Sequence, residues 1–378
     1  MKYSVPARLL ELEESATLKA SEKANEMISK GIKVFKLDVG EPDFQTPKKI
    51  IDAAYNAMLK GFTHYAPSSG IPQLRQAIAE KYSVTQSNVM VTPGSKQGIF
   101  YALYSIINPG EEVLLLNPSW SSYKQIIKLS GGVPVEIDTD ENFTPDIDLI
   151  KKKISKKTKA IIVNSPNNPT GAVYGNKTIK DLSQLAIENG LFIISDEIYD
   201  RLVYESEFVS FRKYMKYEDG LILVNGFSKA YAMTGWRLGY IITSPEIIKQ
   251  MAKLQGHTAT SPTTFAQVAA VTALKECEED VRSMVDEFAE RRKIIIEMLD
   301  KKGLKYVRPE GAFYFFIDLG NYIKNADPAE YLLEKAKVSV TSGLGFGDNY
   351  SSYVRISYAT SRETIISGIE NIFNAIGI

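Results

Sequence analysis

Lys229 and Arg237 are two cations that stand eight positions apart, directly after the apolar run "LILV" (221–224). We expect the chain to leave a buried strand there and to begin a helix near Lys229. Like charges disfavour protonation, so the arginine and the helix start should lower the pKa of this lysine. A lysine that loses its proton is nucleophilic and can form a Schiff base with an aldehyde. A lone Ser-Lys pair is more often an ordinary surface site, so this interpretation needs partner residues.

Asp196 supplies a carboxylate at the end of a second apolar run, "LFIISD" (191–196). At a strand end it should be partly buried, and a buried carboxylate needs a cationic partner. A protonated pyridine nitrogen would be such a partner. A Schiff-base lysine with an aspartate on the pyridinium is the pairing that pyridoxal phosphate requires. Tyr199 follows three residues later and could reach the same ligand.

A phosphate would find donors in the stretch "TPGSKQGIFYALYSII" (92–107), which reads as a Gly-Ser turn that opens a helix. Free backbone N–H groups and the helix dipole favour an anion at such a start. Ser95 adds a hydroxyl and Lys96 a charge, and the planar fork of Arg237 suits a phosphate. Many helices begin with Gly-Ser, so the motif alone is weak.

Six short runs rich in apolar residues alternate with helical patterns, and these elements must position the side chains above. We predict strands at 112–117, 133–138, 159–164, 191–196, 221–225 and 239–243. Strand and helix in alternation predict an α/β fold with a doubly wound, mostly parallel sheet. Ligands bind beyond the carboxyl ends of such strands, where Asn164, Asp196 and Asn225 stand. Taken singly, each of these residues could simply form a turn.

The C-terminal third changes character, because a long helical stretch near 279–301 leaves the sheet region. It is followed by the β-rich runs "GAFYFFIDL", "VSVTSG" and "YVRISYAT", which predict a smaller α+β domain. We expect the N-terminal segment to join it. The predicted division is therefore a small domain of residues 1–45 and 280–378 and a large domain of residues 46–279.

The composition excludes several classes of protein. Lys+Arg and Asp+Glu both number 45 in 378 residues, so the net charge is zero and general nucleic-acid or membrane-surface binding is disfavoured. Cys277 is the one cysteine, and histidine occurs only at His64 and His257. No intramolecular disulfide is possible, and neither a zinc site nor a Ser-His-Asp triad is expected. We expect no metal.

The N-terminal stretch "MKYSVPARLLELEESA" has no apolar leader region, and the apolar runs are too short to span a membrane. We expect a cytoplasmic protein.

Six motifs in this order resemble those of the class I and II aminotransferases, which are fold-type I pyridoxal phosphate enzymes. They are "GEPDF" (40–44), "HYAPSSGIPQLRQAIA" (64–79), "SPNNPTG" (165–171), "SDEIYD" (195–200), "NGFSKAYAMTGWRLGY" (225–240) and "YVRISYAT" (353–360). Within the family they are most similar to the prokaryotic-type aspartate aminotransferase branch, from about residue 10 to the C-terminus. The resemblance implies a large domain with a mostly parallel seven-stranded sheet and a smaller α+β domain.

The same resemblance implies a transaminase that moves an amino group from an L-amino acid, aspartate or glutamate, to a 2-oxo acid. The implied route is a pyridoxal 5'-phosphate Schiff base with ping-pong kinetics. By position, Lys229 resembles the Schiff-base lysine that also shuttles the proton, and Asp196 resembles the partner of the pyridine nitrogen. Asn168 and Tyr199 resemble the pair that hydrogen-bonds the phenolic oxygen. Trp120 resembles the aromatic residue that stacks on the ring.

The remaining implied roles concern the phosphate, the substrate and a second subunit. The phosphate ligands implied are Gly94 through its backbone, Ser95, Lys96, Arg237 and Tyr65 of a homodimer partner. Gly226 stands where some relatives have a phosphate-binding serine, so Ser228 is a candidate replacement. Arg355 and the Gly40 backbone resemble the holders of the substrate α-carboxylate, beside Trp120 and Asn168. Lys96, Ser15 and Thr17 resemble groups that assist a distal carboxylate.

Several alternatives stay open at this point. The chain could be an aminotransferase of broader specificity, of alanine, aromatic or kynurenine/glutamine type, or a β-lyase or a cyclopropane-forming synthase of the same fold. A nicotinamide-dependent dehydrogenase is disfavoured, because no G-x-G-x-x-G follows an early strand. A pyridoxal-binding transcription regulator would need a DNA-binding domain, for which we expect no room before the catalytic part.

Overall fold

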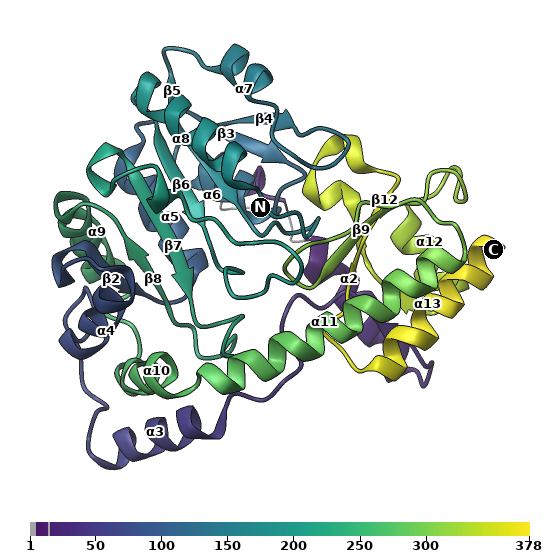
Figure 1. The fold of residues 1–378 in the computed structure, drawn as a ribbon, viewed down its shortest axis with the longest axis horizontal. Coiled ribbons are helices and arrows are strands. Elements are labelled where there is room, and N and C mark those ends of the chain that lie inside the picture. Colours follow the sequence, from purple (N-terminus) through teal and green to yellow (C-terminus); the bar gives the residue numbers. More distant parts are fainter. Residues whose placement is uncertain (1–4, 14–15) are drawn as a thin grey trace.

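The computed structural model describes residues 5–13 and 16–378, and its centre is a seven-stranded sheet (Figure 1). The strand order is β2-β8-β7-β6-β5-β3-β4, in which β8 is antiparallel to β2 and β7 and the other pairs are parallel. The strands are β2 (Val89–Thr92), β3 (Glu112–Asn117), β4 (Val133–Asp138), β5 (Thr158–Asn164), β6 (Phe192–Asp196), β7 (Leu221–Gly226) and β8 (Gly239–Ile242). The α/β class and the six predicted strands are confirmed. The edge strand β2 was missed, because four residues are too few to establish an alternation.

Successive side chains of each strand point to opposite faces of the sheet, and each face is covered by helices. In β3, Val113 and Leu115 pack with α5, α6 and α9, whereas Leu114 and Leu116 pack with α7 and α8. A third cluster joins α3, α4 and α10 to the β2 end of the sheet. These helices are α3 (Lys48–Leu59), α4 (Pro72–Tyr82), α5 (Ser95–Ile106), α6 (Ser122–Leu129), α7 (Ile147–Lys153), α8 (Asn176–Asn189), α9 (Pro245–Thr258) and α10 (Thr264–Glu276).

A second region is built from the C-terminal part of the chain and a short N-terminal segment. It holds a three-stranded antiparallel sheet, β11-β12-β9, and the parallel pair β1-β10. The strands are β1 (Phe35–Lys36), β9 (Tyr314–Asp318), β10 (Val338–Ser339), β11 (Thr341–Ser342) and β12 (Tyr353–Ser357). The helices are α1 (Ala7–Leu10), α2 (Ala16–Ser29), α11 (Glu278–Lys301), α12 (Pro328–Lys335) and α13 (Arg362–Ile376). Short 3-10 turns lie at Gln86–Asn88, Phe211–Lys213, Tyr217–Asp219, Gly343–Phe346 and Asp348–Tyr350.

The long helix α11 links the two regions. Val281 and Met284 pack in the cluster of α3, α4 and α10, whereas Phe288, Ile295 and further residues pack with β9, β12 and α13. The domain boundaries stay a prediction. None of the helices in the described ranges is both long and apolar enough to cross a membrane.

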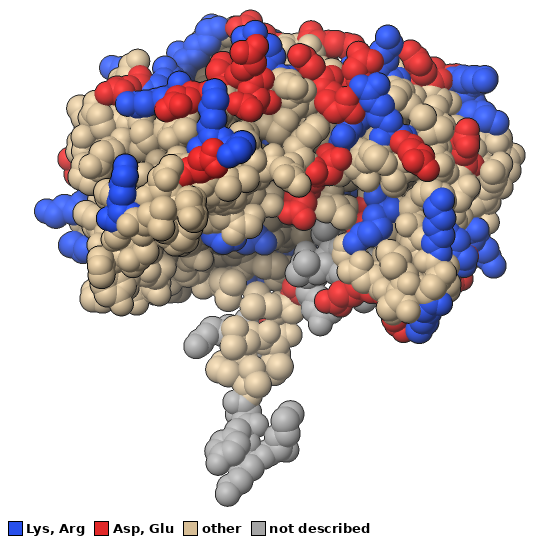
Figure 2. Space-filling view, turned by 90° about the horizontal axis from the view of Figure 1, so that it is seen from below, with Lys and Arg blue, Asp and Glu red and all other residues tan. Residues whose placement is uncertain are grey.

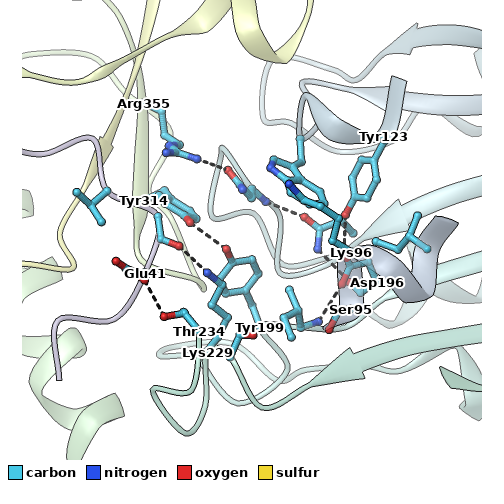
Figure 3. Close-up of a pocket in the computed structure, with 18 of the residues that line it drawn as sticks. Glu41, Ser95, Lys96, Tyr123, Asp196, Tyr199, Lys229, Thr234, Tyr314 and Arg355 are labelled. Carbon is cyan, nitrogen blue, oxygen red and sulfur yellow. Dashed lines mark hydrogen bonds between the residues drawn. The ribbon is translucent and has the colours of Figure 1, made fainter. Parts of the chain in front are cut away.

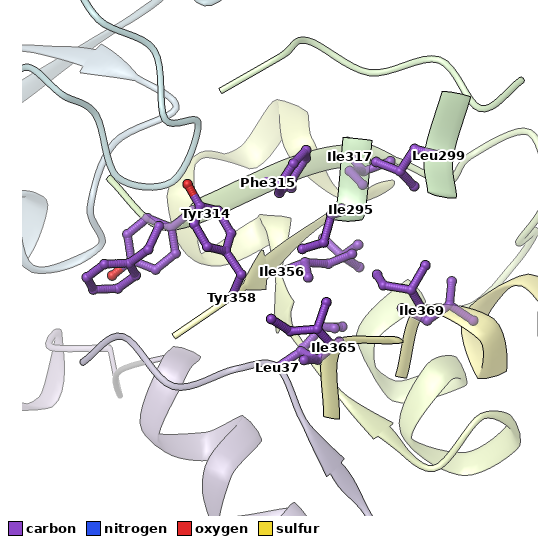
Figure 4. Packing of buried hydrophobic residues seen from close by; sticks show 14 of the residues in the cluster. Leu37, Ile295, Leu299, Tyr314, Phe315, Ile317, Ile356, Tyr358, Ile365 and Ile369 are labelled. Atoms are coloured by element: carbon purple, nitrogen blue, oxygen red, sulfur yellow. The ribbon is translucent and has the colours of Figure 1, made fainter. Parts of the chain in front are cut away.

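Two adjacent residues of α13 test the packing of the second region. Ile365 is fully buried beside Leu37 (Figure 4), whereas the side chain of Ile366 is 38% exposed. We expect Ile365→Ala to lower the free energy of unfolding by about 2–5 kcal/mol through lost burial and a cavity. Ile366→Ala should change it by less than about 1 kcal/mol. Urea denaturation followed by circular dichroism measures both, and equal losses would contradict this packing.

Candidate functional site

A cavity of about 630 Å³ opens at the carboxyl ends of β5, β6 and β7 (Figure 3). The start of α5 and the segment before α3 also border it, as do Tyr314 of β9 and Arg355 of β12. Most of the residues singled out from the sequence line this cavity. They are Gly40, Ser95, Lys96, Trp120, Asn168, Asp196, Tyr199, Ser228, Lys229, Arg237 and Arg355.

Two of the predicted site residues that the structure describes, Gly94 and Tyr65, do not line the cavity wall. Gly94 lies directly before Ser95, as the residue preceding α5. Tyr65 is 89% exposed, so within one chain its side chain points to the surface. Ser15 and the side chain of Thr17 lie outside the described residues.

Lys229 follows β7 in an irregular turn, so the predicted helix start is wrong. Its Nζ donates a hydrogen bond to the carbonyl oxygen of Gly40 and lies within 6 Å of the ring centres of Tyr199 and Phe313. Burial is the main cause that lowers the pKa of Lys229 to about 8, and the charges of Arg355 and Arg237 act in the same direction. The expected direction is confirmed, but loss of solvent outweighs repulsion between cations.

Asp196 ends β6 and is 3% exposed, so its carboxylate is buried deeper than the sequence predicted. Desolvation raises the pKa of Asp196 to about 6, while hydrogen bonds from Tyr123 and Ile198 and the charge of Lys229 oppose the rise. The hydroxyl of Tyr123 donates to Oδ2 at 2.6 Å, and the N–H of Ile198 donates to Oδ1 at 3.2 Å. A carboxylate in this environment gains from a cation placed in the cavity.

Tyr123 and Tyr314 are site residues that the sequence reasoning missed. Tyr123 stands three positions after Trp120, and the two rings meet edge to face at 5.3 Å. The nearness of Tyr123 to Trp120 in the sequence was the available signal; Trp120 precedes α6, and Tyr123 lies in its first turn. The hydroxyl of Tyr314 shares a 2.9 Å hydrogen bond with that of Tyr199. No signal marked Tyr314, because its place depends on the pairing of β9 with β12.

The start of α5 forms a cradle for an anion. The first N–H groups of a helix lack intrahelical partners. Gly94 has φ +84°, and a Cβ there would lie 2.5 Å from Nη2 of Arg237, so glycine lets the guanidinium lie against this turn. Lys96 places its Nζ 4.7 Å from the ring centre of Trp120, and burial followed by the charge of Arg237 lowers the pKa of Lys96.

Gly226 stands in a position that leaves no room for a side chain. A Cβ there would lie 2.6 Å from Oγ of Ser95 and 3.0 Å from Cα of Gly239. The Ser95 hydroxyl donates to the carbonyl oxygen of Asn225 at 2.9 Å. Ser95 therefore occupies the space that a serine at 226 would need, while the buried Ser228 faces the cavity.

Arg355 is 1% exposed, and its guanidinium donates to Oδ1 of Asn168 at 2.9 Å and to the Asp38 carbonyl at 3.0 Å. Among the residues that the structure describes, no carboxylate forms an ion pair with it. A Cβ on Gly40 would lie 3.0 Å from the Tyr314 hydroxyl and 3.7 Å from Nη2 of Arg355. A buried, unmatched guanidinium beside an open cavity can grip a ligand carboxylate.

The cavity thus brings together an amine with a lowered pKa, a buried carboxylate, an anion cradle and a guanidinium that has no carboxylate partner among the described residues. An aldehyde could react with the amine, and a protonated ring nitrogen could pair with the carboxylate. A phosphate could bind in the cradle. This donor set fits pyridoxal phosphate, and the guanidinium remains for a second, carboxylate-bearing molecule.

Comparison with known proteins gives concordant matches. The family model described as aminotransferase class I and II matches residues 32–372. The aspartate/prephenate aminotransferase of Thermus thermophilus is 40% identical over 382 residues, which cover 98% of each chain. The (5-formylfuran-3-yl)methyl phosphate transaminase of Methanocaldococcus jannaschii is 41% identical over 372 residues, 97% of each chain. A solved structure of the T. thermophilus aspartate aminotransferase with maleate has a TM-score of 0.95 at 40% identity and covers 99% of this chain and 100% of that chain.

The lowered pKa of Lys229 predicts unusual reactivity of this amine in the cofactor-free protein. Only the neutral amine is acylated, so the rate at Lys229 should rise with pH and level off above about pH 8. In urea the same lysine should titrate near the ordinary value of about 10.4. Pulse acetylation at several pH values, quantified by peptide mass spectrometry, measures both profiles. Coinciding profiles would show that the fold does not perturb this group.

Proposed function

This chain belongs to the class I and II aminotransferase family and is an amino-acid aminotransferase, and we propose that it transfers the amino group of aspartate or glutamate to a 2-oxo acid with pyridoxal phosphate bound in the cavity. The family resemblance and the fold class inferred from the motifs are confirmed. The observation that carries the proposal is the meeting of Lys229, Asp196 and Arg355 in one cavity. The family is dependent on pyridoxal phosphate.

The residues that would hold this cofactor surround the cavity. The phosphate would bind at the start of α5, with the backbone near Gly94, the side chains of Ser95, Lys96 and Arg237, and the hydroxyl of Ser228 as ligands. Asp196 would pair with the ring nitrogen, Asn168 and Tyr199 with the phenolic oxygen, and Trp120 with the ring face. When bound, pyridoxal phosphate supplies an aldehyde for amines and a ring that withdraws electrons from the adjacent carbon.

Lys229 would hold the cofactor until an amino acid displaces it, and its freed amine would then move a proton. Burial lowers the pKa of Lys229 to about 8, so the neutral form of this amine is far more populated near neutral pH than that of an exposed lysine. A neutral Nζ could take the proton from the substrate Cα and deliver it to the former aldehyde carbon of the cofactor, on the other side of the amino nitrogen. Such general acid–base transfer contributes about 10²–10⁴-fold to a rate.

Asp196 would keep the ring nitrogen protonated. Its desolvated carboxylate is stabilised by a cation more strongly than an exposed carboxylate would be. The Tyr123 hydroxyl and the Ile198 N–H fix its two oxygens, so the charge is held at one place in the cavity.

The substrate would be oriented by its two ends. Arg355 would bind the α-carboxylate bidentately, next to the Gly40 backbone, which lies beside its guanidinium. Lys96 would assist a distal carboxylate, with Ser15 and Thr17 as further candidates. A relative named as an aspartate aminotransferase has been solved with maleate, a dicarboxylate, which supports an acidic substrate.

Broader specificity is the second candidate. The transaminase of M. jannaschii carries a name that contains neither aspartate nor glutamate, although it is as similar to this chain as the aspartate enzymes are. The amino donor and acceptor must therefore be established by direct assay.

We also propose a homodimer that shares its active sites, in the cytoplasm. Exposed apolar side chains gather on α3 and after it: Ile51, Tyr55, Met58, Leu59, Phe62 and Tyr65. Figure 2 shows the molecule from the side on which α3 lies; acidic and basic side chains gather in the upper half of this view, and the lower half is poorer in charge. A patch of this kind favours association with a second copy, and Tyr65 would then reach the phosphate of the partner.

A half-reaction assay tests the proposed function. The purified yellow protein is mixed with single amino acids, and loss of the cofactor absorbance is followed. We expect aspartate and glutamate to bleach it with release of a keto acid and no ammonia. Reduction with borohydride should leave a pyridoxyl label on Lys229. The variant Lys229→Ala should bind cofactor but lose nearly all turnover, whereas the control variant Lys177→Ala should keep its turnover.

Three results of that assay would change the assignment. Bleaching by alanine or phenylalanine would broaden the specificity, and release of ammonia would indicate a lyase. Normal turnover of Lys229→Ala would contradict the role of this lysine.

The dimer is tested at its apolar patch. Leu59 is 68% exposed on α3, and Leu59→Glu should convert the dimer into monomers with weakened cofactor binding, because a buried, unpaired charge destabilises an interface. Leu129→Glu, on the exposed end of α6, is the matched control and should leave a dimer. Light scattering after size exclusion measures the mass. A monomeric native protein at micromolar concentration would refute the shared site.

A further inference from the structure

We propose that Arg291 is a positioning residue for the pocket segment 38–47, which it holds through Asp43 so that the backbone of Gly40 stays beside Lys229 and Arg355. The inference rests on the proposed function for its kinetic consequences. Arg291 belongs to α11 and acts through the segment, at a distance from any substrate.

Arg291 and Asp43 form a two-pronged ion pair. Nη1 and Nη2 donate to Oδ1 and Oδ2 of Asp43 at 2.7 and 3.1 Å. The arginine is 5% exposed, and its guanidinium lies 5.0 Å from the ring centre of Phe44 and 5.6 Å from that of Phe288. A planar guanidinium can make the fork and both ring contacts together, which an ammonium cannot.

The far side of the arginine is fixed as well. Its Nε donates to Oε1 of Glu287 at 2.9 Å, one turn earlier on α11. Glu287 also accepts two hydrogen bonds from Arg362 at the start of α13, which together with the one from Arg291 lower its pKa to about 2. Arg291 is thus anchored to two helices and has little freedom to follow a moving loop.

The pocket segment depends on such side-chain ties, because residues 38–47 contain neither helix nor strand. Its Gly40 carbonyl accepts from Lys229, and its Asp38 carbonyl accepts from Arg355. Glu41 accepts a hydrogen bond from Thr234 at 2.7 Å (Figure 3). The segment therefore touches both the amine and the guanidinium of the cavity.

The segment is also tied to the turn that carries Lys229. The Thr46 hydroxyl donates to the carbonyl of Ala232 at 2.6 Å and accepts from Nε1 of Trp236 at 3.0 Å. Ala232 has φ +50°, a left-handed conformation that a residue with a Cβ adopts at a cost. Asp43 lies between these contacts, so loss of its tie to α11 would loosen the segment in its middle.

The neighbouring Arg292 provides a matched control on the same helix. It is 3% exposed and also forms a two-pronged pair, with Glu205 at 3.0 Å for each contact. Glu205 lies outside the pocket segment and does not line the cavity. The Glu205 side chain is more exposed than that of Asp43, 65% against 32%, so the two pairs are compared by their effect on KM: a purely structural role of Arg291 would leave KM unchanged in variants of either pair.

The decisive comparison uses Asp43→Asn and Arg291→Lys against Glu205→Gln and Arg292→Lys. In the first pair of variants we expect KM for the amino acid to rise on the order of tenfold while kcat falls less, because the carboxylate grip is misplaced. Cofactor affinity should stay within about twofold of the native value. The control variants should keep native KM even where their melting temperature falls.

A second readout needs no turnover. In the cofactor-free protein, acetylation of Lys229 should be several-fold faster in Asp43→Asn than in Glu205→Gln, because the Gly40 carbonyl no longer holds the amine. Equal acetylation and an unchanged KM, with similar losses of melting temperature in both sets, would overturn the proposal. If the native protein transfers no amino group, the proposed function fails, and the acetylation comparison still decides the role of Arg291.

Discussion

The desolvation of one amine is the constraint on which the site depends. Lys229 leaves the central sheet at the end of β7 and enters a cavity walled by aromatic rings and by two arginines. An ammonium loses more solvation in such a place than a neutral amine does, so burial favours the nucleophilic form. The packing of the fold therefore lowers the pKa of the amine, mainly through burial. The charges of the nearby arginines lower this pKa further.

The same loss of solvent acts on Asp196 with the opposite chemical result. It raises the pKa of this carboxyl to about 6, while Tyr123 and the Ile198 N–H oppose the rise. Burial in one cavity of low dielectric thus favours the neutral forms of both the acid, Asp196, and the base, Lys229. A ligand bound between the two groups can stabilise each of them. A ligand with one cationic nitrogen and one electrophilic carbon satisfies both groups at once. The site is complementary to such a ligand before any substrate carboxylate meets Arg355.

Much of this could be predicted from the sequence, because the relevant signals are local. The apolar runs located six of the seven strands, and the polar residues that end β5 and β6 line the cavity. Features that depend on strand pairing or on contacts between residues far apart in the chain could not be predicted from the sequence. Tyr314 reaches Tyr199 only through the register of β9 against β12, and the irregular turn at Lys229 has no sequence pattern that separates it from a helix start. The burial that dominates the pKa of Lys229 is likewise a property of the assembled fold.

Three glycines constrain the spacing of the motifs in this chain, although the chemistry uses other residues. Added side chains at Gly94, Gly226 and Gly239 would lie within 2.4–2.6 Å of Arg237 or of Ser95. The end of β7 and the start of β8 can approach the start of α5 only because these positions carry no Cβ. This approach brings Arg237, which precedes β8, the Ser95 hydroxyl of α5 and the Lys229 amine after β7 to one wall of the cavity. A shift of one residue in any of the three segments would replace a glycine by a larger residue at the contact. The lack of space for a Cβ at these three glycines therefore limits the positions in the sequence at which the reacting side chains can occur.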